Sequence, residues 1–278
     1  MTPVQPIFVL EEMAQIDQLL INVLKSLEPA DWAKQTIAPL WKVKDVAAHL
    51  LDGSIRGVSL SRDQYFGDPP VHVHSYEDLI SYLNRLNADW VQAMRRMSPP
   101  LLITFLETAN QAYLEHLKTL DPFAKALFSV GWAGEETSLN WFHIAREYTE
   151  KWHHQQQIRL AVGKDRELLE PKFYQPLIDT FMRALPHHYR MVEAKDGTVV
   201  QFTISNLSST WYLLRSRSEW KLFSDCELSL HALITIDPRI AWRIFTKGIS
   251  RTEAQKHISI EGDLELGTHI LSMIAIMG

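Results

Sequence analysis

The sequence is poor in cysteine, because Cys226 is the one cysteine among 278 residues. A single cysteine cannot form a disulfide within the chain, and structural disulfides are rare in the reducing cytoplasm. The first residues also lack the basic start, apolar run and small-residue cleavage site of a secretory signal peptide. We therefore expect a cytoplasmic protein.

Excess positive charge and long apolar runs are also missing. Lysine and arginine total 28 against 33 aspartate and glutamate residues, which gives a net charge of −5. A sequence-independent nucleic-acid binder needs a basic face, so this class is not expected. No apolar run reaches the roughly 18 residues that a membrane-spanning helix requires, so we expect no membrane partner.

The chain has instead the composition of a soluble globular protein, with 46% hydrophobic and 22% charged residues. Its length allows one large domain or two of ordinary size. Apolar residues recur at helical spacing in the first part of the chain. The predicted helices cover residues 9–27, 43–65, 76–97, 99–120 and 139–162, and Ser75 with Asp78 is expected to cap the third.

The pattern changes after a proline-containing junction. Residues 196–206, 209–223, 226–238 and 257–263 alternate apolar and polar side chains, as strands do. Residues 240–248 and 264–277 have helical spacing. The predicted fold is therefore an all-α N-terminal four-helix bundle over residues 1–165, followed by a smaller α+β domain over residues 166–278.

The helix predicted over residues 139–162 carries an unusual polar stripe. His143, Glu147, Glu150 and His154 follow one another at spacings that place them on one helical face. Buried carboxylates are costly unless they are paired or bind a metal, and helical bundles build metal sites in this way. A second face formed by the apolar residues of this helix competes for the core, so periodicity leaves both faces open. Those residues are Trp141, Ile144, Tyr148 and Trp152.

A further histidine, His49, lies among apolar residues in the helix predicted over 43–65. With Glu150 and His154 it completes a donor set of two imidazoles and one carboxylate, which suits zinc, nickel or ferrous iron. His153 lies about 100° round the helix from His154 and is not expected to face the same metal. A lone histidine on an apolar face is more often a core residue, so the three must be taken together.

Other polar residues are given weaker roles. His143 and Glu147 are interpreted either as groups that orient the metal ligands or as a hydrogen-bonded rim. His72 and His74, in a predicted loop, are interpreted as surface residues.

Several segments resemble a known family. The stretch WKVKDVAAHLLDG, with Trp41 eight residues before His49, resembles the second helix of the DinB-like four-helix bundle superfamily. Together with EKWHH, LNADWVQAMRRMSP and GWAG, it is more closely similar to the N-terminal domain of mycothiol-dependent maleylpyruvate isomerases. This resemblance covers roughly residues 8–165. The segments ITIDPRIAWRIFTKGIS and ISIEGDLELGTHILSMIAIM resemble the sterol-carrier-like domain that follows the bundle in that family.

The resemblance implies a site and an activity. His49, Glu150 and His154 match the metal ligands, with zinc expected first and nickel or iron as alternatives. Gln157 stands where the family has an aspartate. The family also brings an arginine of the C-terminal domain near the metal, for which Arg239 or Arg243 could serve, and no motif fixes which. A low-molecular-weight thiol such as mycothiol or bacillithiol is the implied second cofactor.

The expected function is therefore that of an enzyme, a metal- and thiol-dependent transferase or isomerase acting on a small electrophilic molecule. Two alternatives stay open. One is a metal-dependent hydrolase of a small amide or ester. The other is a non-catalytic binder whose apolar groove is lined by aromatic residues of the second domain, although these are more often core residues. The aromatic residues in question are Trp211, Tyr212, Trp220 and Trp242. The oligomeric state is not predicted.

Overall fold

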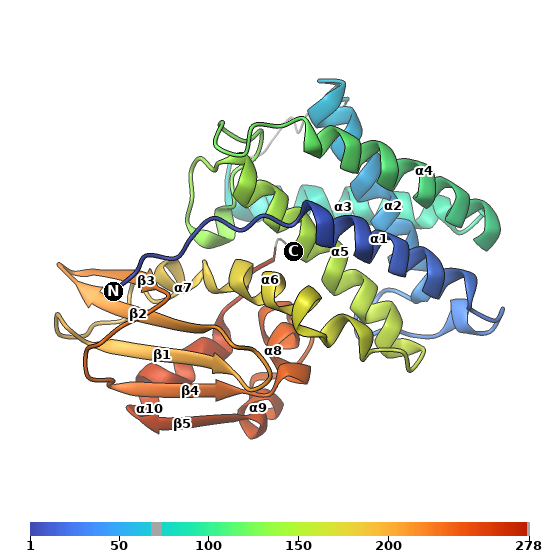
Figure 1. Cartoon of the computed structure of the whole chain (residues 1–278). Coiled ribbons are helices and arrows are strands. Elements are labelled where there is room, and N and C mark those ends of the chain that lie inside the picture. Colours follow the sequence, from blue (N-terminus) through green and yellow to red (C-terminus); the bar gives the residue numbers. More distant parts are fainter. Residues whose placement is uncertain (68–73, 277–278) are drawn as a thin grey trace. The chain divides into compact units, whose positions relative to one another are not determined.

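The computed structural model describes residues 1–67 and 74–276 (Figure 1). The described residues form two compact units. The bundle unit comprises residues 9–127 and 150–168, and the sheet unit comprises residues 1–8, 128–149 and 169–276. Helix α5 (Asn140–Ala161) contributes residues to both units. The predicted domain boundary after residue 165 stays a proposal.

The bundle unit is helical, as its periodicity predicts. Its elements are α1 (Leu10–Lys25), η1 (Asp31–Ala33), α2 (Val43–Gly57), the π-helical turn η2 (Val58–Arg62), α3 (Tyr76–Met94), α4 (Pro99–Lys118), the C-terminal half of α5 and η4 (Glu167–Leu169). The predicted cap of α3 is confirmed, because Ser75 Oγ accepts from the Asp78 amide at 3.1 Å and Asp78 Oδ2 accepts from the Ser75 amide at 3.0 Å. The all-α N-terminal prediction is therefore confirmed.

The sheet unit has the predicted α+β character. Its strands are β1 (Val199–Ile204), β2 (Thr210–Ser216), β3 (Glu219–Phe223), β4 (Ala232–Ile236) and β5 (Ile258–Gly262). Within the described residues they form one mixed sheet in the order β3-β2-β1-β4-β5, in which only the β1–β4 pair is parallel. Its helical elements are η3 (Gly131–Ala133), α6 (Pro171–Met182), α7 (Leu185–His188), α8 (Pro238–Phe245), α9 (Arg251–Ala254), η5 (Gln255–His257), α10 (Leu264–Thr268) and η6 (His269–Ser272).

Two details of the sheet unit differ from the sequence pattern. The alternating stretch 209–223 is a hairpin of two strands, whose turn residues Arg217 and Ser218 have φ of 52° and 63°. The helix predicted over residues 264–277 is too long, because α10 ends at Thr268. After η6 the chain becomes extended, and the Ala275 amide donates to the Phe245 carbonyl at 3.0 Å. This tertiary bond replaces the expected helical one.

Among the described residues, no helix is both long and apolar enough to cross a membrane.

A buried ion pair joins helices at the centre of the bundle unit. Lys151 Nζ on α5 lies 2.8 Å and 3.0 Å from the two carboxylate oxygens of Asp17 on α1. The same ammonium lies 3.3 Å from Ser54 Oγ on α2 and 3.0 Å from Asn110 Oδ1 on α4. All four side chains are buried. Burial raises the pKa of Asp17, while the charge of Lys151 opposes that rise.

Removing the ammonium from this group should destabilise the fold strongly. Lys151→Met leaves the Asp17 carboxylate buried without a countercharge, at an expected cost of about 3–5 kcal/mol in unfolding free energy. The matched control is Lys25→Met, which breaks the exposed Lys25–Glu107 pair at 2.5 Å and should cost ~0–1 kcal/mol. Urea unfolding measures both variants. Equal small losses would contradict a central role for Lys151.

A glycine marks a close approach in the sheet unit. Gly134, at the end of η3, has φ of +82°, and a Cβ there would collide with the His187 side chain. Gly163, after α5, has a similar φ of +72°, but a Cβ there would meet nothing within 4 Å. An alanine at Gly163 would therefore meet backbone strain alone, whereas an alanine at Gly134 would meet both backbone strain and steric overlap.

These glycines predict two different losses of stability. Gly163→Ala should cost about 1–2 kcal/mol, because it places an L-residue in the left-handed region. Gly134→Ala should lose this amount and about 1–3 kcal/mol more, because the new methyl group overpacks His187. Thermal unfolding of both variants provides the comparison. A smaller loss for Gly134→Ala than for Gly163→Ala would show that the site near His187 is not tightly packed.

Candidate metal centre

Helix α2 carries His49, and a short turn before the helix presents Trp41. The Trp41 carbonyl accepts hydrogen bonds from Gln35 Nε2 at 2.9 Å and Thr36 Oγ1 at 2.7 Å. The next amide, that of Lys42, donates to Asp45 Oδ2 at 3.0 Å, which satisfies a backbone donor at the start of α2. These bonds fix where the helix begins, and so the direction in which His49 points.

Helix α5 carries Glu150 and His154, and every residue from 141 to 160 is buried or half-buried. Tyr148 and Trp152 on the aromatic face are fully buried, while His143 and His154 on the polar stripe are 3% and 8% exposed. The two faces that the sequence offered as alternatives are therefore both inside the protein. A helix surrounded by protein must satisfy its polar side chains internally.

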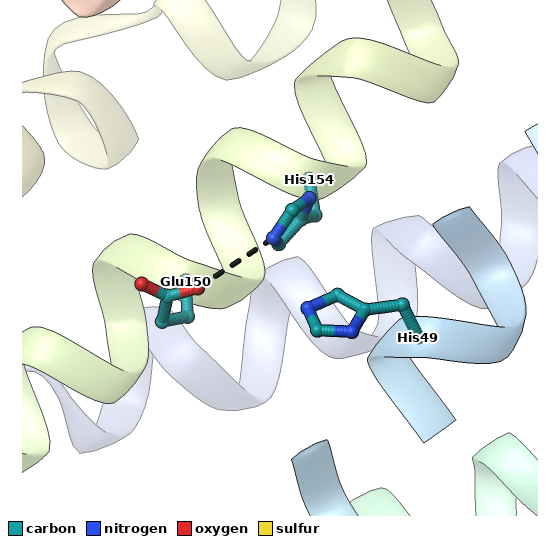
Figure 2. A group of neighbouring side chains, drawn as sticks. All are labelled: His49, Glu150 and His154. Carbon is teal, nitrogen blue, oxygen red and sulfur yellow. Dashed lines mark ion pairs between the residues drawn. The ribbon is translucent and has the colours of Figure 1, made fainter. Parts of the chain in front are cut away.

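The structure brings the three predicted ligands together. Donor atoms of His49, Glu150 and His154 all lie within 4.8 Å of one another. His154 Nε2 lies 3.5 Å from Glu150 Oε2, one helical turn away on α5. The rings of His49 and His154 meet edge to face with centroids 4.6 Å apart. Figure 2 shows the three side chains turned toward a common point, with His49 approaching from the neighbouring helix.

Aromatic rings surround the two histidines. The Trp41 ring centroid lies 4.7 Å from that of His49 and 5.8 Å from that of His154. His153, the alternative ligand, is buried and packs its ring against His154 with centroids 3.9 Å apart. These contacts limit the rotation of both imidazoles.

The surroundings of His49 favour the neutral form of its imidazole. Burial, with a smaller contribution from neighbouring His154, holds the pKa of His49 well below its ordinary value. Its Nδ1 atom is buried and has no hydrogen-bond partner among the described residues. Neutral histidine is the form that binds metals. The neutral imidazole and the donor chemistry therefore fit a divalent cation.

A charged pair on the same face of α2 was missed in the sequence. Asp52 and Arg56 follow His49 by three and seven residues, and Arg56 Nε lies 2.9 Å from Asp52 Oδ2. Burial raises the pKa of Asp52, and the charge of Arg56 opposes this rise. Arg56 also donates to Asn87 Oδ1 at 3.2 Å. The helical spacing from His49 was the available signal, because it places all three on one stripe.

The residues with weaker predicted roles lie as follows. Arg146 Nη2 lies 2.9 Å from His143 Nδ1 and donates to Glu147 Oε1 at 2.6 Å, which agrees with a hydrogen-bonded rim. A role for these two residues in orienting the ligands stays a prediction. His74 is exposed, and His72 falls outside the described residues.

The two candidate arginines lie on α8 of the sheet unit, in different surroundings. Arg239 is exposed and donates through Nε and Nη2 to both carboxylate oxygens of Asp237, at 3.1 Å and 2.6 Å. Arg243 is partly buried and donates through Nε to the Gly248 carbonyl at 3.1 Å. Burial lowers the pKa of Arg243. An approach of either arginine to a metal stays a proposal.

The aromatic residues suggested for an apolar groove are largely core residues. Trp211, Trp220 and Trp242 are each at most 5% exposed, while Tyr212 is half-buried. Trp211 Nε1 donates to Asp179 at 3.0 Å and Trp220 Nε1 donates to the Val192 carbonyl at 3.1 Å. Their burial and internal bonds are those of packing residues in the sheet unit.

Comparison with solved structures shows the same fold elsewhere. The crystal structure of the mycothiol-dependent maleylpyruvate isomerase, and that of a histidine-to-alanine mutant of it, each match with a TM-score of 0.50 at 13% identity. Each match covers 92% of this chain and 94% of the other chain. A protein titled UbiJ-SCP2 ubiquinone synthesis protein matches 38% of this chain and 89% of its own at 12% identity, with a TM-score of 0.25. No curated protein matches the sequence.

Comparison with family profiles identifies the helical part of the chain. The profile described as the mycothiol maleylpyruvate isomerase N-terminal domain matches residues 13–159. The matched segment includes His49, Glu150 and His154, and it spans more than half of the 278 residues. The chain therefore belongs to the mycothiol maleylpyruvate isomerase N-terminal domain family.

Proposed function

We propose that this protein is an enzyme that holds a divalent cation with His49, Glu150 and His154. It uses a low-molecular-weight thiol, either as a cofactor that promotes the isomerisation of a small electrophile or as the group that is transferred to it. The observation that carries the metal site is the convergence of these three donors from two helices. The neutral state of His49 supports it as well, because burial holds the pKa of this histidine well below its ordinary value and neutral imidazole is the form that binds a metal.

The three ligands have complementary roles. His49 and His154 supply neutral nitrogen donors and Glu150 supplies one negative charge, a set that suits zinc first and nickel or iron as alternatives. A cation held by three protein ligands keeps open positions and supplies Lewis acidity that lowers the pKa of a bound thiol or water. The Trp41 ring lies against both imidazoles, which restricts their motion.

The thiol part of the proposal rests on family membership. A thiol provides a reversible nucleophile for an electron-poor double bond, so it can promote isomerisation about that bond without being consumed. The matched solved structures belong to an enzyme named for mycothiol and maleylpyruvate, and we propose a related unsaturated small molecule as the substrate. A metal-dependent hydrolase would need water but no thiol, so thiol dependence separates the two activities.

Between the two candidate arginines, Arg243 is the better one for binding a substrate carboxylate. Arg239 already donates twice to the carboxylate of Asp237. Arg243 uses only Nε in the hydrogen bonds found among the described residues. Its remaining guanidinium donors match the planar geometry of a carboxylate.

Metal content tests the site directly. His49→Phe should reduce bound zinc from about one ion per chain to background, measured by elemental analysis after reconstitution and desalting. In chelator its unfolding free energy should stay within ~1 kcal/mol of wild type, because the change removes a buried nitrogen that has no partner. His116→Phe is the control, since His116 lies on α4 and bonds to Ser61. Metal retention by His49→Phe, or none in wild type, would refute the site.

Thiol dependence tests the activity. Zinc-loaded protein should isomerise a cis-unsaturated dicarboxylic acid such as maleylpyruvate only when a thiol is added. Ultraviolet absorbance measures the rate of this reaction. Mycothiol, bacillithiol and glutathione form the thiol panel. Glu150→Gln should bring the rate to that of the uncatalysed reaction, because it removes the only charged ligand. Ester or amide turnover without thiol would instead support the hydrolase.

A further inference from the structure

The ring of His154 is held by a hydrogen bond that does not involve another metal-site ligand. His154 Nδ1 lies 3.1 Å from Oε1 of Gln157, one turn further along α5. The opposite ring nitrogen, Nε2, faces Glu150 Oε2 at 3.5 Å. Both His154 and Gln157 are buried. The imidazole is thus placed between an amide oxygen and the candidate metal site.

The chemistry of this bond determines which nitrogen carries the proton. An amide oxygen can only accept a hydrogen bond, so its partner, Nδ1, must be protonated. In a neutral imidazole the lone pair then lies on Nε2, which is the atom that faces Glu150. The opposite tautomer would place the Nδ1 lone pair against the Gln157 oxygen, and its Nε2–H would face Glu150 as a donor instead of being free to bind a cation.

We propose that Gln157 is a positioning residue that selects the Nδ1–H tautomer of His154 and so prepares Nε2 to bind the cation. This inference rests on the proposed metal site. Because the amide is neutral, Glu150 remains the only negative charge contributed by these four side chains. A carboxylate at position 157 would make the same bond and would add a second negative charge behind the histidine.

The neighbouring rings make the bond effective. His153 packs against His154 with ring centroids 3.9 Å apart, and Trp41 lies at 5.8 Å. A ring confined in this way cannot readily turn to exchange its two nitrogens. Gln157 therefore acts on the choice of tautomer rather than on the position of the ring alone.

The tautomer can be measured in the protein without metal. Nitrogen-15 NMR of histidine side chains distinguishes a protonated from an unprotonated ring nitrogen, and His154→Phe assigns the signals. In metal-free wild type, the neutral form of His154 should have a protonated Nδ1 and an unprotonated Nε2. A protonated Nε2 with an unprotonated Nδ1 would overturn the inference without any reference to activity.

Variants at position 157 test the consequence for metal binding. Gln157→Leu should populate both tautomers and weaken zinc binding about 10–100-fold, as loss of a ligand's hydrogen-bond partner commonly does. Gln157→Glu should restore the bond and bind zinc at least as tightly as wild type. Competition with a chromophoric chelator measures the dissociation constants. Wild-type affinity in Gln157→Leu, or weaker binding by Gln157→Glu than by Gln157→Leu, would refute the proposal.

The control is a second buried glutamine on the same helix. Gln156 donates through Nε2 to the Asp165 carbonyl at 2.6 Å, so Gln156→Leu loses a bond elsewhere. It should lower stability while leaving the His154 tautomer and zinc affinity unchanged. If wild type binds no zinc, the proposed metal site is refuted, and the NMR measurement of the His154 tautomer still tests the role of Gln157. If zinc binds but position 157 has no effect, only the role of Gln157 fails.

Discussion

The buried ammonium of Lys151 is the constraint on which the bundle depends. It lies among Asp17, Ser54 and Asn110, each from a different helix. A charge in such a place is tolerated only where its partners are held in fixed positions. Because Lys151 is adjacent to Glu150, the interactions that satisfy the ammonium also set the rotation of α5. The metal-site geometry therefore follows from the packing of the bundle.

The same reasoning explains why α5 can be rich in polar residues and still be buried. Lys151 is neutralised by Asp17, and the histidine ring at position 154 has Gln157 on one side and Glu150 on the other. His49 brings a second imidazole from α2 toward Glu150 and His154. The convergence of two imidazoles and one carboxylate inside the bundle unit is the physical basis of the proposed function.

Helical periodicity predicted the main helices and brought His49, Glu150 and His154 forward as candidates. It could not show that α5 is buried on all sides, because a polar helix inside a protein has the same sequence pattern as one at the surface. The partner of Lys151 was equally hidden, since Asp17 is 134 residues away. The 217–218 turn was missed because it has neither glycine nor asparagine. What remained unpredicted thus depends on tertiary contacts.

The central claim is that one cation binds between His49, Glu150 and His154. Anomalous diffraction at the zinc absorption edge, from crystals of the zinc-loaded protein, tests it most directly. The account predicts a single strong peak bounded by these three side chains, with Nε2 of His154 as its donor. A zinc peak elsewhere, with density between the three residues absent in fully loaded crystals, would contradict it.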